Sequence, residues 1–234
     1  MNNELKYEAI KDMIQKFHDA KAMTDYIHPD LLPDIALYMD QVTTFMDEHL
    51  KNTKRYPDDK ILTKTMINNY AKNELLPAPE KKKYSKEHLL LLTFIYYYKS
   101  FLSINDIQTL LKPITDNYFH SDSDLNLERI YEDIYNTQMA LTDELFEDLE
   151  SKYHYAGEAF PDASAKDRNR LSLFSFVCTL SYDISVKKQL IEHIIDYMHE
   201  TEAAEKESAK GNIKETKKEK DAAAKKDRKS KENK

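Results

Sequence analysis

The chain has 234 residues, enough for one or two domains with a hydrophobic core, and a net charge of -7. Its two glycines favour a mostly helical fold, and its single cysteine, Cys178, excludes an internal disulfide framework. The longest apolar run, Leu89–Tyr98, is shorter than the roughly 20 residues of a membrane-spanning helix, and the first residues lack an apolar signal core. We therefore expect a soluble, cytoplasmic protein with no membrane contact.

The charge is unevenly distributed along the chain. Residues 51–100 carry 11 Lys and Arg against 5 Asp and Glu, whereas residues 101–200 carry 8 against 19. A basic segment between acidic flanks predicts an anionic partner that is met locally. The alternative is a lysine-rich face that is only solvated.

The first 34 residues are predicted to form a packing helix and an irregular connecting segment. Ile10, Ile14 and Phe17 recur at helical spacing, and Pro29 and Pro33 interrupt any continuation. Asp34 can start the next helix, which would extend to about Asn52 and be the first helix of a DNA-binding module. A polar connection, Lys51–Lys60, follows it.

The segment Thr63–Asn73 is predicted to be a recognition helix. Thr63 is a suitable N-cap, and Ile67 and Tyr70 lie on one side at about 100° per residue. The opposite side presents amide, hydroxyl and ammonium groups, of which asparagine amides suit the major-groove edge of adenine. The residues predicted to face the groove are Lys64, Thr65, Asn68, Asn69 and Lys72.

A proline-stiffened basic loop, Pro77–Tyr84, comes next. Its three adjacent lysines, Lys81, Lys82 and Lys83, are predicted to neutralise phosphates beside the groove. Ser85 then caps a helix that is apolar almost all round and should lie in the core. Ser103 opens a further helix, predicted to run through Leu111, and Pro113 follows.

These motifs resemble the MerR-type winged helix-turn-helix domain. Within this group the chain is most similar to an uncharacterised domain-of-unknown-function family of low-GC Gram-positive bacteria, in which Met-Ile-Asn-Asn-Tyr, Pro-x-Pro and Lys-Lys-Tyr-Ser-x-Glu-His recur. The resemblance implies a DNA-binding domain over residues 35–112. The matching positions, in order, are Thr63, Ile67, Tyr70, Leu75-Leu76-Pro77, Lys83-Tyr84-Ser85 and Ser103-Ile-Asn-Asp106-Ile107.

Four departures from the MerR pattern bear on how DNA would be contacted. Asn68 stands where better-known regulators usually have a phosphate-binding arginine, and Asn69 where they often have an aromatic residue or histidine. Glu74 replaces a common glycine, and the wing is short. The base preference of the known regulators therefore does not carry over to this chain.

Residues 113–200 are predicted to be an acidic, helical dimerisation or regulatory region. Asp116–Asp124 would be a linker, a helix would be capped near Asn126, and Thr142 or Asp143 could restart it. Gly157 and Pro161 are expected to break the chain before two apolar helices, Leu171–Leu180 and Val186–Met198. Residues 201–234, rich in Lys, Glu and Ala, are expected to be disordered or transiently helical.

No pattern for catalysis, metal ligation or cofactor binding is present. The histidines are scattered, the glycines are too few for a phosphate loop, and Cys178 lies inside an apolar helix. We expect a nearly all-α, non-enzymatic protein that acts as a sequence-specific transcriptional regulator, binding double-stranded DNA as a homodimer. The alternative is a protein-interaction adaptor whose acidic helical region is the docking surface.

Overall fold

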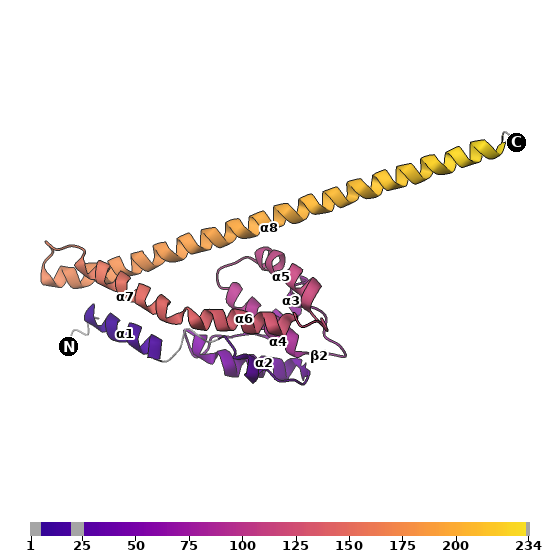
Figure 1. The fold of residues 1–234 in the computed structure, drawn as a ribbon. Coiled ribbons are helices and arrows are strands. Elements are labelled where there is room, and N and C mark those ends of the chain that lie inside the picture. The colour runs from indigo at the N-terminus through magenta and orange to yellow at the C-terminus, as the bar shows by residue number, and fades with distance from the viewer. Residues whose placement is uncertain (1–5, 20–25, 233–234) are drawn as a thin grey trace. The chain divides into compact units, whose positions relative to one another are not determined.

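The computed structural model describes residues 6–19 and 26–232. The fold is nearly all-α, as predicted, and within the described residues the helices are accompanied by one short two-stranded sheet (Figure 1). The chain forms two compact units, residues 1–189 and residues 190–234. The candidate site lies in the first unit.

The helix predicted from Asp34 begins instead at Met39. After α1 (Glu8–Asp19) and a 3-10 turn (Pro29–Leu31), the chain forms the strand β1 (Leu37–Tyr38) and then α2 (Met39–Leu50). The residues of β1 pair with a strand far along the chain, and this pairing overrides the helical spacing seen in the sequence. Asp34 itself binds the ammonium of Lys86 at 2.9 Å.

The helices that follow begin directly after the predicted N-cap residues. They are α3 (Lys64–Lys72), α4 (Lys86–Tyr98) and α5 (Ile104–Tyr118), and the strand β2 (Lys83–Tyr84) lies between α3 and α4 along the chain. The hydroxyl of Thr63 accepts a hydrogen bond from the Met66 amide at 3.2 Å. Ser103 and Asp106 exchange bonds between side chain and backbone at 3.2 and 3.0 Å, which is a capping box.

The prediction that the helix opened by Ser103 ends at Leu111 was wrong. Helix α5 continues through Pro113 to Tyr118, because a proline removes only its own amide bond and the turns after it have side-chain support. Lys112 and Asp116 form an ion pair at 3.0 Å one turn apart, and the side-chain Nδ2 of Asn117 donates to the Pro113 carbonyl at 2.7 Å.

The larger core of the first unit is built around α4. Every residue from Leu89 to Ile95 is buried, as expected for a helix that is apolar on all sides. Helix α6 (Leu127–Ala140) packs against α4, and its buried Tyr131 donates a hydrogen bond to the Ile27 carbonyl at 2.7 Å. The cap predicted at Asn126 is present, since its side chain accepts from the Arg129 amide at 3.0 Å.

The remaining helices are α7 (Thr142–Glu158) and α8 (Ala165–Glu232). The break predicted at Gly157 and Pro161 is present, since α7 ends one residue after Gly157 and residues 159–164, which include Pro161, are not helical. A Cβ at Gly157 would be 3.0 Å from the Tyr7 ring, so the glycine makes room for that ring. The break expected between Leu180 and Val186 is absent, because the intervening residues include neither proline nor glycine. Residues 201–232 are helical.

Helices α1, α7 and the start of α8 share a small core of their own. Ile14 of α1, Phe146 and Ala156 of α7 and Phe176 of α8 are buried together. The ring of Tyr7 stacks on that of Tyr153 at 4.6 Å between centroids. The N-terminal helix is thus a packing element, as predicted.

Candidate nucleic-acid interface

Helix α3 has the two faces that its sequence predicts. Ile67 and Tyr70 are 0% and 5% exposed and point into the core, and burial raises the pKa of the Tyr70 hydroxyl. Four predicted contact residues form the solvent-exposed face: Thr65, Asn68, Asn69 and Lys72. Their side chains form no ion pair or side-chain hydrogen bond within the part of the chain that the structure describes.

Helix α3 ends in a Schellman motif that has glutamate in the glycine position. The amide of Leu75 donates to the Tyr70 carbonyl at 2.9 Å, and the amide of Glu74 donates to the Ala71 carbonyl at 3.2 Å. This geometry requires a left-handed residue, and Glu74 adopts it with φ 57°. Leu75 and Leu76 are then buried, so the end of α3 is fixed to the core.

The basic loop forms a tight hairpin turn, which we call the basic hairpin (Glu80–Lys83). The Lys83 amide donates to the Glu80 carbonyl at 2.8 Å, which leaves a two-residue loop. Its residues, Lys81 and Lys82, both have positive φ, 47° and 66°. A type I′ turn needs such angles and normally uses Asn-Gly, so two lysines occupy strained positions at an exposed tip.

Two of the predicted contact lysines already have partners. Lys64 forms an ion pair with Asp40 in the first turn of α2. The Lys83 ammonium lies 5.1 Å from the centre of the Tyr38 ring, a cation–π contact across the sheet. For Lys72, Lys81 and Lys82, by contrast, the described residues include no ion-pair partner. These three are the lysines best placed to meet an external anion.

His88 fixes the start of α4 directly behind the hairpin. Its Nδ1 accepts hydrogen bonds from the Ser85 amide at 3.0 Å and from the Ser85 hydroxyl at 2.8 Å, so histidine takes the place that glutamate has in a capping box. Its ring lies edge-on to Tyr84 and Phe119. Burial, and then the charge of His120, lower the His88 pKa to about 4, so the ring is neutral near pH 7.

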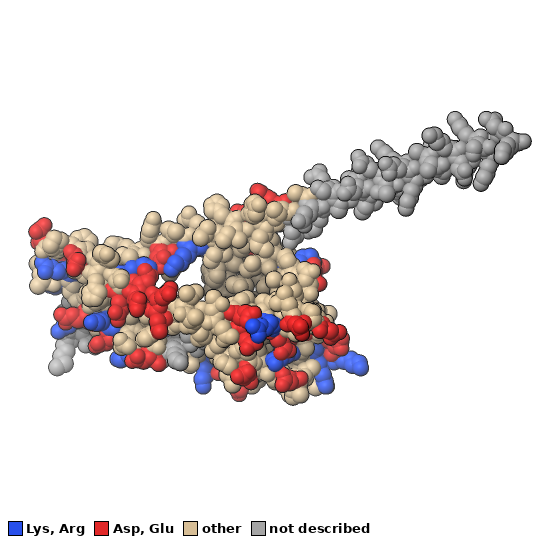
Figure 2. All heavy atoms as spheres, viewed as in Figure 1, with Lys and Arg blue, Asp and Glu red and all other residues tan. Residues whose placement is uncertain are grey.

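The charges around the site are mixed in sign. Figure 2 shows acidic and basic side chains interspersed on the face in view, with Lys and Arg gathered at the lower right, where Figure 1 labels β2. Asp40 pairs with Lys64, Glu74 follows the end of α3, and Glu80 begins the basic hairpin. The basic character of residues 51–100 is therefore concentrated at a few exposed lysines, not spread over a continuous patch.

Sequence reasoning missed Tyr38 as part of this surface. The helix predicted from Asp34 included this residue, but in β1 its ring is 54% exposed beside Lys83. The alternation of buried Leu37 and exposed Tyr38, typical of a strand, appears only in the structure, because both residues are hydrophobic in the sequence.

The part of the chain that the structure describes has no group of three or more potential metal ligands. Its helices also include none that combines the length and apolar character needed to cross a membrane.

Comparison with known proteins identifies a family over part of the chain. Residues 27–134 match the domain of unknown function DUF1836, and this match extends from the segment before β1 into α6. No curated protein and no solved structure matches the chain.

Proposed function

We propose that the DUF1836 domain of this chain is a MerR-like winged helix-turn-helix module, and that the protein regulates transcription by binding specific sequences in double-stranded DNA. The observation that carries the proposal is the pairing of a helix whose exposed face is rich in amides with a strained hairpin tip made of lysines. The first suits base edges and the second suits phosphates.

The order of elements supports the winged-helix part of the proposal. A strand precedes α2 and α3, its partner strand follows the basic hairpin, and α4 and α5 complete the domain. The α2–α3 connection, residues 51–63, is longer than the three to four residues of a tight helix-turn-helix. The start of α3 is fixed by the burial of Ile61 and Leu62, and not by a tight turn.

In the proposed complex α3 lies in the major groove. Asn68 and Asn69 present side-chain amides that can donate and accept at once, as adenine recognition requires. Lys81 and Lys82 contact the phosphate backbone, because their ammonium groups extend from an exposed turn and the described residues offer them no carboxylate partner. The strain at these two positions has a physical reason under this proposal, since asparagine and glycine would fit the turn better but carry no charge.

We further propose that the protein acts as a homodimer. The side of α8 that faces away from α1 and α7 carries Phe174, Val177 and Ile184, which are 66%, 60% and 64% exposed. At about 100° per residue the three fall within about 80° of one another on the helix surface. A second copy would cover this face and would bring two reading helices to two half-sites.

The test is selection of genomic fragments by the full-length chain, followed by sequencing and a salt titration of the best fragment. The proposal expects a shared sequence motif and an affinity that falls steeply with salt, because each neutralised phosphate releases counterions. A DNA affinity that does not change with salt concentration, or no enrichment of any fragment, would contradict the proposed regulatory function. That result would favour the adaptor alternative, which is supported by the acidic balance of residues 101–200.

A further inference from the structure

A pocket of about 430 Å³ lies between the α2–α3 connection and the end of α4. The connection contributes residues between Thr53 and Ile61, and α4 contributes Tyr96 and Tyr97, followed by Lys99. The whole pocket belongs to the first unit and to the segment that matches DUF1836. Its volume is in the range of sites that hold small organic molecules.

The ammonium of Lys99 is fixed at the wall of this pocket by two contacts. It donates a hydrogen bond to the Ile61 carbonyl at 2.8 Å and lies 4.5 Å from the centre of the Tyr96 ring. The ring is itself held in place, because the Tyr96 hydroxyl bonds the hydroxyl of Thr53. Lys99 therefore has a defined position, whereas an exposed lysine samples many rotamers.

No carboxylate neutralises this ammonium within the part of the chain that the structure describes. Lys99 is half-buried, and burial lowers the pKa of its ammonium. The lining includes the carboxylate of Asp59, but that group accepts a hydrogen bond from the Tyr56 amide of its own loop at 2.9 Å. Lys54, which is also part-buried in the lining, pairs with Asp47 at 2.7 Å. Lys99 thus differs from Lys54 in having no counter-ion among the described residues.

A part-buried ammonium without a counter-ion is unfavourable, and an anion from solution would complete it. An ammonium has three N–H donors, of which the Ile61 carbonyl accepts from one, so a carboxylate beside Lys99 has donors to bond. The last turn of α4 carries partial negative charge, which favours a singly charged anion over a doubly charged one. The rings of Tyr96 and Tyr97 offer surface for an organic body.

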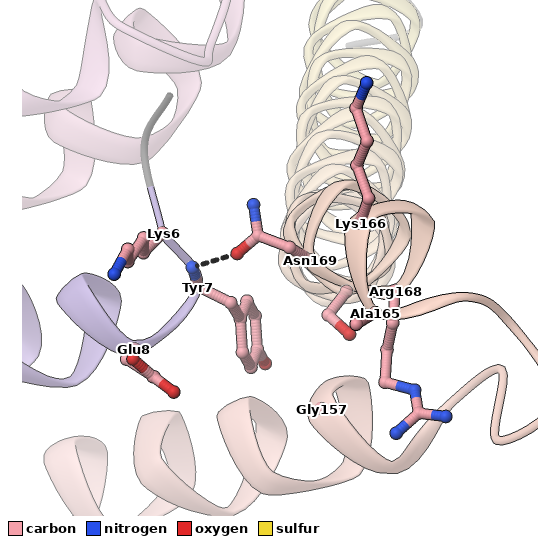
Figure 3. Close-up of a pocket in the computed structure, with 9 residues that line it drawn as sticks. Lys6, Tyr7, Glu8, Gly157, Ala165, Lys166, Arg168 and Asn169 are labelled. Carbon is pink, nitrogen blue, oxygen red and sulfur yellow. Dashed lines mark hydrogen bonds between the residues drawn. The ribbon is translucent and has the colours of Figure 1, made fainter. Parts of the chain in front are cut away.

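The larger pocket of the first unit, shown in Figure 3, is arranged differently. It has a volume of about 580 Å³ and lies between the start of α1, the end of α7 and the start of α8. Its lining includes Lys6, Lys166 and Arg168, but Figure 3 shows these side chains pointing in different directions. They do not converge on one anion, whereas the ammonium of Lys99 is fixed beside two tyrosine rings.

We propose that the pocket at Lys99 binds a small organic molecule that carries one carboxylate group. The carboxylate accepts from the Lys99 ammonium, and the exposed Lys60, which also lines the pocket, adds a second positive charge. The organic part lies against the rings of Tyr96 and Tyr97. A ligand here joins the α2–α3 connection to α4 and so stabilises the folded chain.

The experiment is isothermal titration calorimetry of the full-length chain with acetate, benzoate and benzamide in a carboxylate-free buffer. Benzoate should bind at one site per chain, more tightly than acetate because its ring contacts the tyrosines. Benzamide has nearly the same shape without the charge and should bind at least about tenfold more weakly than benzoate, the scale of one lost hydrogen bond to a charged group. Equal affinities for benzoate and benzamide would overturn the proposal, as would no binding of benzoate.

Two variants locate the site. Lys99→Met keeps an unbranched side chain against Tyr96 without the charge, and it should weaken benzoate binding by about tenfold or more. The matched control is Lys51→Gln, an exposed lysine of the same connection outside the pocket lining, which should leave the affinity unchanged. Equal weakening by both variants would contradict a site at Lys99.

Because Lys99→Met also removes the bond to Ile61, a second measurement uses the unaltered chain. Reductive methylation with formaldehyde modifies free amines, and mass spectrometry reports the extent at each lysine. Benzoate should slow modification of Lys99, since a bound carboxylate holds its amine in the charged form, and should not affect Lys51. No protection of Lys99, or equal protection of both lysines, would overturn the site. No DNA is present in these assays, so their outcome is independent of the proposed regulatory function.

Discussion

The ammonium of Lys83 lies 5.1 Å from the ring centre of Tyr38, its partner across the two-stranded sheet. The contact joins Lys83, the last residue of the basic hairpin, to Tyr38, the N-cap of α2. Because β1 and β2 are only two residues each, side-chain contacts of this kind contribute much of what fixes the hairpin.

Tyr38→Ala should therefore loosen the hairpin. The expected loss is about 0.5–1 kcal/mol of unfolding free energy, the scale of an exposed cation–π pair. Urea denaturation measures it. Tyr38→Phe keeps the ring and should behave as the parent chain; equal loss in both variants would show that the hydroxyl and not the ring matters.

Replacing both tip residues, Lys81→Asn with Lys82→Gly, should raise stability while weakening DNA binding. Asn-Gly suits positive φ at both positions, and relief of the strain should contribute about 1–2 kcal/mol. Removal of two phosphate contacts should flatten the plot of log affinity against log salt by roughly 1.8. Thermal melts and fluorescence anisotropy measure the two effects, and a gain in stability with unchanged DNA affinity would contradict the phosphate role.

Asn68→Ala and Lys82→Ala should have different effects on DNA binding, the first on sequence specificity and the second on overall affinity. Loss of the Asn68 amide should relax sequence choice by about 1–3 kcal/mol at one base pair, whereas loss of the Lys82 ammonium should weaken binding to all sequences alike. Anisotropy with the selected fragment and single-base variants distinguishes them. Asn136→Ala, on the exposed side of α6, is the matched control. The assignment fails if Asn68→Ala lowers all affinities in parallel.

Glu74→Gly should stabilise the chain by about 1 kcal/mol, because glycine adopts the left-handed angle at the end of α3 without strain. The urea midpoint should rise with an unchanged slope. Glu74→Gln, which removes the charge but keeps the strain, should show no such gain. If Gln and Gly gave the same increase, the charge and not the backbone would be its cause.

The depressed pKa of His88, about 4, predicts an acid-sensitive fold. The unfolded chain binds a proton near pH 6.5 and the folded chain does not, so this contribution is complete above pH 6.5 and is lost progressively towards pH 4. Between pH 7 and pH 5 the loss should be about 2 kcal/mol. His88→Gln, which can still accept from the Ser85 amide, should remove this part of the pH dependence; an unchanged difference between the two pH values would contradict the assignment.

Local signals in the sequence determined the helices of this protein, their caps and the two faces of α3. Hydroxyl and amide caps such as Thr63 and Asn126 act within four residues of themselves, and the 3.6-residue period separates Ile67 from Asn68 without reference to the rest of the chain. The apolar character of α4 likewise predicted its burial.

Only the tertiary structure decided the features that depend on distant residues. Leu37 and Tyr38 are a strand because Lys83 and Tyr84 pair with them, and the ring of Tyr7 packs where a Cβ at Gly157 would be only 3.0 Å away. The pairing of Lys64 with Asp40 depends in the same way on neighbours brought together by folding. Such contacts depend on three-dimensional packing, which a local sequence pattern does not encode.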